Sequence, residues 1–239
     1  MLRAHNRATS IGMRLSEALM RKFLQKKITK SQYIMERLRL EAKVKSLTEG
    51  SVRQIKRLNE RDPFLTMLYN RSKFESLARA AFEKSKKQSY VLIDIDKFKN
   101  LNDTLGHDAG DIAIRFFASH LNALAHEKKW NGFAGRGGSG DEFEVVLPFS
   151  PSRAAAFFRQ LERRLVQHFS NRFEPAVVSA LQGKLFTLSV GVAGFEEGKE
   201  IGEVRKLADK RLYQSKEMGR NRVTFSGKKG TFVIRRERK

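Results

Sequence analysis

The hydrophobic and polar positions of the first sixty residues follow a helical spacing. Residues 10–60 contain no proline, and apolar side chains recur there close to every seventh position, which predicts a long helix and suggests a coiled coil. Those positions are Tyr33, Leu40, Val44, Leu47, Ile55 and Leu58. Asp62-Pro63 ends the pattern, because proline restricts the residue before it and cannot continue a helix. We therefore expect a domain boundary here.

Beyond residue 62 the spacing alternates between that of helices and that of strands. The expected helices cover 71–86, 111–124, 151–169 and 200–217, and the expected strands cover 90–96, 130–135, 142–148 and 186–195. The two middle strands flank a glycine-rich stretch, which favours an antiparallel hairpin, and RVTF and TFVI near the carboxyl end predict another. This order predicts an α+β domain with a mixed sheet flanked by helices, preceded by a helical extension.

The composition favours a globular protein in a reducing compartment. The chain has 239 residues, 40% of them hydrophobic, and no cysteine. Disulfides, thiolate metal sites and cysteine nucleophiles are therefore excluded, and we expect a cytoplasmic location. No apolar stretch approaches the roughly 18 to 20 residues that span a bilayer, so no transmembrane segment is expected.

The net charge of +22 is concentrated at the two ends of the chain. Residues 1–61 carry 16 basic and 5 acidic side chains, and residues 220–239 carry 8 basic and 1 acidic, whereas the segment between them is nearly balanced. Basic ends of this kind attract nucleic acid or anionic membranes. A solvated basic surface that only keeps the protein soluble is the alternative, and both interpretations stay open.

Four acids lie at the ends of two expected strands. Asp94 and Asp96 follow an apolar run, and Asp141 and Glu142 begin the strand after the glycines. If these strands are neighbours, Asp94 and Asp141 could hold Mg²⁺, which binds through a few carboxylates together with water and substrate phosphates. Such a site suits phosphoryl or nucleotidyl transfer. Solvated acids at the surface of the sheet are the alternative.

The glycine-rich turn adds a second chemical signal. Gly137, Gly138, Ser139 and Gly140 carry little or no side chain, so their backbone N–H groups could approach a phosphate or a nucleotide base. A merely flexible loop is the alternative interpretation of the same composition.

Four motifs follow one another in the domain: YVLIDIDKFKNLNDTLGHDAGD (90–111), SGDEF (139–143), TLSVGVA (187–193) and ADKRLYQSKEMGRNRV (208–223). In this order they closely resemble the GGDEF family of diguanylate cyclases. The resemblance implies a palm-like nucleotidyl-cyclase fold and a homodimer that condenses two GTP molecules into cyclic di-GMP and two pyrophosphates. It also implies a basic helical extension for dimerisation or sensing (1–61), a catalytic domain (62–226) and a basic tail (227–239).

The same resemblance implies roles for the acids and for the turn. Asp94, the carbonyl of Ile95 and Asp141 match the ligands of Mg²⁺ or Mn²⁺, and Glu142 matches the second signature acid, so Asp141 and Glu142 are the expected catalytic residues. Ser139 and Gly140 match the part of the turn that lies beside the nucleotide.

Further matching positions imply how GTP is bound. Asn102 and Asp111 match the residues that contact guanine, and a carboxylate can accept both the N1–H and the 2-amino group of guanine, which adenine does not offer. Lys216 and Arg220 match the phosphate-binding pair, and Lys99 could assist them.

The chain departs from the family pattern in four places. Ser139 replaces the first signature glycine, and Arg136 precedes it by three residues in place of two, as if one glycine were inserted. DPFLTMLYNR (62–71) has one extra residue and has Met67 at a glycine position. No Arg-x-x-Asp motif precedes the turn, so feedback inhibition through that site is not expected.

Three functions are therefore weighed. The leading hypothesis is an active, Mg²⁺-dependent diguanylate cyclase. A catalytically inactive GGDEF-type module that binds GTP or a signalling partner is the alternative that the altered turn favours. A protein that binds polyanions through its basic ends is the third.

Overall fold

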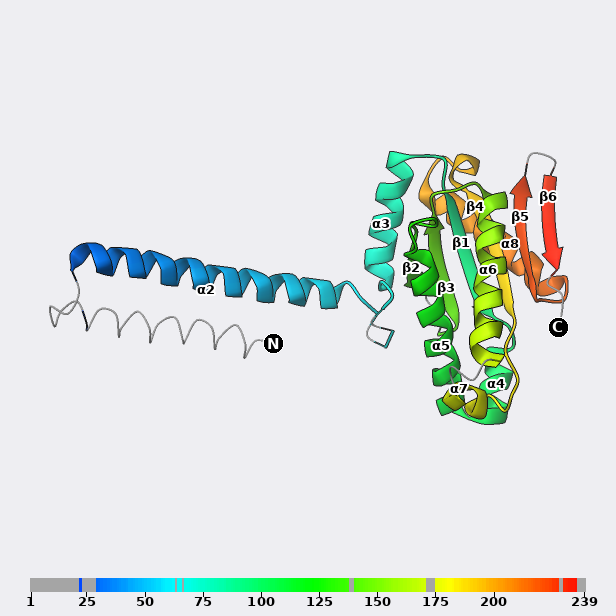
Figure 1. Ribbon diagram of the computed structural model, residues 1–239. Coiled ribbons are helices and arrows are strands. Elements are labelled where there is room, and N and C mark those ends of the chain that lie inside the picture. The colour runs from blue at the N-terminus through cyan, green and yellow to red at the C-terminus, as the bar shows by residue number, and fades with distance from the viewer. Residues whose placement is uncertain are drawn as a thin grey trace. The chain divides into compact units, whose positions relative to one another are not determined.

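The computed structural model in Figure 1 describes residue 22 and residues 29–62, 64–65, 67–137, 140–170, 175–227 and 230–235. The chain divides into two compact units, Met1–Glu60 and Arg61–Lys239. Within the first unit, helix α2 spans Lys30–Asn59. The expected helical residues before position 29 lie outside the described residues, apart from residue 22, which is helical.

Helix α2 begins at a reciprocal cap. The backbone N–H of Thr29 donates to Oε1 of Gln32 at 2.8 Å, and the N–H of Gln32 donates to Oγ1 of Thr29 at 3.2 Å. This exchange satisfies two N–H groups that a helix start otherwise leaves unpaired. Three large apolar side chains of α2, those of Ile34, Met35 and Leu38, are about half exposed within this unit.

The second unit is built on a six-stranded mixed sheet with the order β2-β3-β1-β4-β5-β6. The strands are β1 (Ser89–Ile95), β2 (Phe133–Arg136), β3 (Glu142–Leu147), β4 (Leu188–Gly194), β5 (Arg222–Gly227) and β6 (Gly230–Arg235). All neighbours are antiparallel except β4 and β5, which are parallel. The predicted mixed sheet is thus confirmed, and β6 continues it into the segment after residue 227.

Helices cover both faces of this sheet (Figure 1). They are α3 (Arg71–Lys84), α4 (Phe98–Leu105), α5 (His107–Ala125), α6 (Pro151–Ser170), α7 (Pro175–Ala180) and α8 (Ile201–Glu217), with a short 3-10 turn at Phe195–Glu197. Alternate residues of each strand point to opposite faces, so the sheet separates two apolar clusters. One cluster packs under α3 and α8, and the other packs under α5 and α6.

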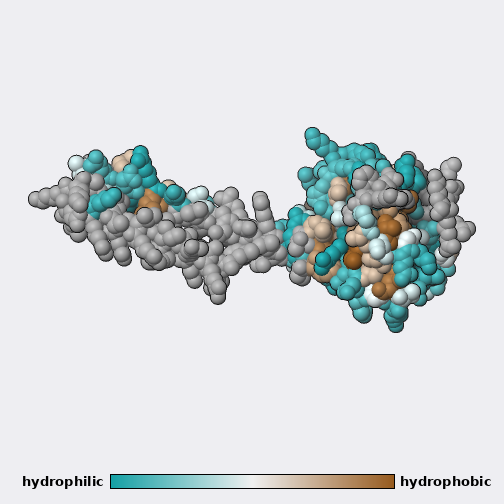
Figure 2. Space-filling model, turned by 60° about the horizontal axis from the view of Figure 1, so that its bottom comes forward, coloured by the Kyte–Doolittle hydropathy of each residue, from teal (hydrophilic) through white to brown (hydrophobic). Residues whose placement is uncertain are grey.

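Two features of this packing bear on the site. Helix α8 lies directly on β4. A Cβ built at Gly191 would stand 2.1 Å from the carbonyl oxygen of Ala208, so only glycine fits at this position. At the end of the domain where β1 runs into α4, hydrophobic side chains gather among hydrophilic ones (Figure 2). Half-buried side chains that pack on the core near this end include Leu101 and Leu105 of α4.

The main differences from the sequence prediction are short helices. Helix α4 was not predicted, although Phe98, Leu101 and Leu105 have helical spacing, because glycine and polar residues follow closely. Helix α5 begins at His107, four residues earlier than expected. The short α7 was also missed.

Candidate functional site

The pairing of β1 with β3 brings two distant acidic segments together. Asp94 and Glu142 are direct antiparallel partners, and the N–H of Ile95 donates to the carbonyl oxygen of Asp141 at 3.3 Å. Directly opposed residues of an antiparallel pair point to the same face. Ile93 and Phe143 point to the α5–α6 core, so Asp94 and Glu142 face the side that α8 covers.

Asp94 occupies an enclosed position with one cationic partner. Its side chain is largely buried, and its Oδ2 accepts a hydrogen bond from Nζ of Lys216, in the last turn of α8, at 2.6 Å. Burial raises the pKa of Asp94, Lys216 opposes this, and the charges of Asp141 and Asp96 add to it. Asp94 thus pairs with Lys216 while the charges of two further carboxylates act on it, and added positive charge would stabilise its ionised form.

These residues fit a divalent cation that also binds substrate. In the described part of the chain, no group of three or more His, Asp or Glu side chains is arranged to hold an ion by itself. Mg²⁺ commonly binds through one or two carboxylates and completes its shell with waters and phosphate oxygens. Asp94 and Asp141, whose charges interact, carry carboxylates of that kind, and the backbone N–H of Ile95 donates to the carbonyl oxygen of Asp141.

A second part of the site lies between α4 and α5. The Oδ1 atom of Asn102 is buried and has no hydrogen-bond partner among the described residues. A Cβ built at Gly110 would stand 1.8 Å from this oxygen, so only glycine allows α5 to approach so closely. Buried polar groups are normally paired, and an unpaired acceptor calls for an explanation such as an absent ligand. Asp111, the next residue of α5, is exposed.

The predicted phosphate-binding residues lie at two helix ends. Lys216 contacts Asp94 directly, whereas Arg220 is exposed just beyond α8 and Lys99 is exposed in the first turn of α4. Gly219, Arg220 and Asn221 follow one another with φ values of 100°, 61° and 52°. Left-handed backbone is unfavourable for residues that carry a Cβ, so tertiary contacts must hold this turn.

The signature turn is tied to the segment that enters the domain. Ser139 and Gly138 lie outside the described residues, but the carbonyl of Gly140 accepts a hydrogen bond from Nη2 of Arg136 at 3.0 Å. The same guanidinium lies 3.4 Å from Oδ1 of Asp62 and 5.3 Å from the ring centroid of Phe64. The arginine that the sequence showed as displaced therefore still connects the turn to the domain entrance.

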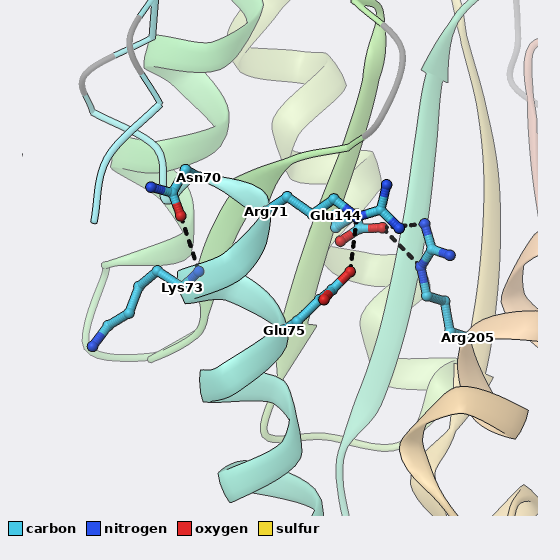
Figure 3. Close-up of polar contacts among 6 residues, drawn as sticks. All are labelled: Asn70, Arg71, Lys73, Glu75, Glu144 and Arg205. Atoms are coloured by element: carbon cyan, nitrogen blue, oxygen red, sulfur yellow. Dashed lines mark hydrogen bonds and ion pairs between the residues drawn. The ribbon is translucent and has the colours of Figure 1, made fainter. Parts of the chain in front are cut away.

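Sequence reasoning missed a buried ion pair next to Glu142. Glu144, two residues further along β3, is almost fully buried, and its Oε1 accepts from Nε and Nη2 of Arg205 on α8 at 3.0 and 2.9 Å (Figure 3). Burial raises the pKa of Glu144, and Arg205 opposes that shift. The neighbouring pair of Arg71 and Glu75 is exposed. A single acid within an apolar strand gave no signal for this pairing.

Sequence comparison identifies the domain. A family model described as "Diguanylate cyclase, GGDEF domain" matches residues 61–222. Diguanylate cyclase A of Treponema denticola is 37% identical over 148 residues, which are 60% of this chain and 36% of that protein. The chain spans 36% to 45% of the length of the first curated relatives that it matches. No helix in the described part of the chain is long and apolar enough to cross a membrane.

Solved structures lead to the same family. The coiled coil and GGDEF domain of DgcB from Caulobacter crescentus, in complex with c-di-GMP, aligns with a TM-score of 0.64 at 26% identity, covering 81% of this chain and 99% of that one. The active GGEEF domain of a Vibrio cholerae diguanylate cyclase aligns with a TM-score of 0.55 at 32% identity, over 66% and 97% of the two chains. The predicted palm-like cyclase fold is confirmed, and the chain belongs to the GGDEF-domain diguanylate cyclase family.

Proposed function

We propose that this protein is a Mg²⁺-dependent diguanylate cyclase that acts as a homodimer and condenses two GTP molecules into cyclic di-GMP and two pyrophosphates. The observation that carries the proposal is the pairing of Asp94 with Glu142 in the sheet, which brings the acids of two segments together, while Lys216 binds Asp94. Carboxylates for a metal and a cation for phosphate thus occur within one site, as nucleotidyl transfer requires.

The chain's own residues would select guanine at the α4–α5 end. The buried Oδ1 of Asn102 is an acceptor that an N–H group of a base could satisfy. The exposed carboxylate of Asp111, one residue beyond Gly110, would accept from N1–H and the 2-amino group. A site built to receive donors disfavours adenine, because an unpaired carboxylate would remain beside the base.

The triphosphate would lie near the end of α8. Lys216 already donates to Asp94 and has further N–H groups to offer, and Arg220 and Lys99 are exposed and carry the charge that phosphates need. Bound Mg²⁺ would lower the pKa of a ribose 3′-hydroxyl and neutralise charge at the α-phosphate that this hydroxyl attacks. Asp94, Asp141 and the carbonyl of Ile95 would hold the ion, and Glu142 would lie beside the reacting groups.

One chain would supply half of the reaction. Each of the two bonds in cyclic di-GMP joins two nucleotides, so two domains must face one another with GTP bound in each. The exposed apolar side chains of α2 offer a surface for pairing two copies. DgcB, whose solved structure includes a coiled coil and a GGDEF domain, is an example of this combination in a relative.

The direct test is product analysis. The purified full chain is incubated with GTP and MgCl₂, alongside Asp141→Asn, and the nucleotides are separated by chromatography. We expect cyclic di-GMP from the wild type, at least a hundredfold less from the variant, and no conversion of ATP. GTP binding without any product would support the inactive module, which the shifted glycine turn favours. Failure to bind GTP would overturn both functions.

A further inference from the structure

Asp96 is a buried acid to which the proposed mechanism assigns no role. It lies directly after β1, two residues beyond Asp94, and only 7% of it is exposed. Its Oδ1 accepts from Oγ of Ser189 at 2.6 Å. Its Oδ2 accepts from Oγ1 of Thr187 at 2.6 Å and from the backbone N–H of Asn221 at 2.9 Å. Both oxygens are therefore engaged by donors that come from two distant segments.

The donor at Asn221 belongs to the strained turn between α8 and β5. Gly219, Arg220 and Asn221 all have positive φ, and two of the three carry side chains. Such a backbone persists only where the surroundings hold it. The N–H of Arg220 donates to the carbonyl of Ser215 at 3.0 Å, and the N–H of Asn221 donates to Asp96. The carboxylate thus supplies one of the contacts that fix the backbone on either side of the Arg220 Cα.

The two acids at the end of β1 hold the two ends of the same basic segment. Asp94 contacts Lys216 through its side chain, and Asp96 contacts the residue after Arg220 through its backbone. Lys216 and Arg220 are the cations placed at the triphosphate. Because the direction of an arginine side chain follows from the φ and ψ of its own residue and its neighbours, release of Asn221 would redirect Arg220.

We propose that Asp96 is a positioning residue that holds the Gly219–Asn221 turn so that Arg220 points at the triphosphate of bound GTP. This inference rests on the proposed function. It differs from a role for Asp96 as a metal ligand, because a ligand role would require its oxygens to give up the hydroxyl and N–H donors that now surround them.

The test compares ligands with and without the outer phosphates. Binding of 3′-deoxy-GTP, which lacks the attacking hydroxyl, and of GMP is measured by calorimetry with Mg²⁺ present. Asp96→Ala is expected to weaken 3′-deoxy-GTP binding about tenfold, the scale of one lost charge-assisted hydrogen bond, and to leave GMP binding within about twofold. Arg220→Ala should give the same pattern, and the double variant should be no weaker than Arg220→Ala alone.

Two further variants separate positioning from general damage. Asp96→Asn keeps the volume and one acceptor oxygen, so it should fold and show a smaller loss. Glu197→Gln is the matched control. The carboxylate of Glu197 also accepts hydrogen bonds from a backbone N–H, that of Gly194, and from the guanidinium of Arg211, but it lies outside the proposed site. It should lower stability without changing the ratio of the two affinities. Hydrogen exchange at the Asn221 amide should accelerate in Asp96→Ala and not in Glu197→Gln.

The outcomes are distinguishable. A wild type that does not bind 3′-deoxy-GTP would overturn the proposed function, and the role of Asp96 would fall with it. A wild type that binds, with Asp96→Ala unchanged or with equal losses for GMP and 3′-deoxy-GTP, would overturn the positioning role alone. Additive losses in the double variant would also contradict it, since they would mean that Asp96 acts independently of Arg220.

Discussion

Nζ of Lys216 donates to Oδ2 of Asp94 at 2.6 Å, which joins the last turn of α8 to the end of β1 at the proposed site. The two side chains are 31% and 10% exposed, so water weakens the interaction only in part. If Lys216 also contacts a phosphate of GTP, it would hold that phosphate close to the carboxylate proposed to bind the metal.

Replacement of Lys216 by methionine keeps the apolar stem and removes the charge. We expect kcat/KM for GTP to fall between about tenfold and a hundredfold, the range for loss of a hydrogen bond to a charged group. Steady-state kinetics of cyclic di-GMP formation would measure the change. Lys210→Met, on an exposed position of the same helix, is the control. Equal activity of the two variants would contradict a role for Lys216 at the phosphates.

Gly110→Ala tests the close packing of α5 against Asn102. The added Cβ would collide with Oδ1 of Asn102, so we expect a loss of about 1–3 kcal/mol in the free energy of unfolding, the usual cost of overpacking. KM for GTP should rise as well, because Asn102 must move. Urea titration would measure the free energy of unfolding. Gly202→Ala in α8 is the control, because the nearest atom there is a flexible Glu200 oxygen, and it should be neutral or stabilising.

Glu197→Gln tests a pH-dependent ion pair outside the site. Burial alone would raise the pKa of Glu197, but Arg211 and the N–H of Gly194 bind the carboxylate and hold its pKa below the ordinary value. The contribution of this ion pair to folding stability is therefore present above the ordinary pKa of a glutamate. It is lost as the pH falls through the pKa of Glu197 in the folded protein. Unfolding at neutral pH should show a loss of about 1–3 kcal/mol for the variant, which shrinks below about pH 4. A constant difference across pH would refute the pair's role.

Arg205→Met tests the buried pair with Glu144. The pKa of Glu144 is shifted in the opposite direction from that of Glu197. The pKa of Glu144 is raised, so the stability linked to this group is full below its ordinary pKa and falls as pH rises through the folded value. The variant without Arg205 should lose about 1–3 kcal/mol in the free energy of unfolding at neutral pH. This is less than for a fully buried pair, because Arg205 is partly exposed. The loss should be much smaller at about pH 4.

Two variants serve as controls for that measurement. Arg71→Met breaks the exposed neighbouring pair with Glu75 and should change stability far less. Glu144→Gln combined with Arg205→Met should remove most of the pH dependence, because no buried carboxylate remains to titrate. If the double variant keeps the full dependence, another group is responsible.

Dimerisation through α2 is tested by charge on the side that carries the exposed apolar residues Ile34 and Leu38, which differs from the side of the heptad positions Tyr33 and Leu40. Ile34 and Leu38 are one helical turn apart and 46% and 55% exposed in the unit to which they belong. Replacing both by glutamate should convert a dimer to a monomer in light scattering and reduce activity most at low protein concentration. Lys43→Glu, on another side of the helix, is the control. A monomeric wild type with full activity would contradict the proposed homodimer.

The sequence predicted the order of strands and helices well, because buried strands such as VLIDI and amphipathic helices such as 151–169 carry strong periodicity. The proposed metal site depended on the condition that the strands of Asp94 and of Asp141–Glu142 are neighbours, and the register of β1 and β3 meets this condition. Helix α4 was missed, since eight residues give too short a pattern to separate from a loop.

The side-chain partners could not be predicted. Glu144 interrupts an apolar strand, and only the packing of α8 on the sheet shows that Arg205 reaches it. Asp96 looked equivalent to Asp94 in the sequence, because both follow the same strand. Their neighbours differ: Asp94 faces a cation, whereas Asp96 faces hydroxyl groups and a backbone amide that arrive from β4 and from the end of α8. Such contacts depend on tertiary packing that no local pattern encodes.

The side chain of Arg136 connects the start of the domain with the glycine-rich turn. One guanidinium contacts Asp62, lies against Phe64 and binds the carbonyl of Gly140, while Arg115 of α5 covers Phe64 at 4.4 Å from its ring centroid. A shift of the chain at Asp62 would thus move the loop at Gly140 without repacking the hydrophobic interior. The backbone at Asp62 and the backbone at Gly140 are coupled through the rearrangement of a single arginine.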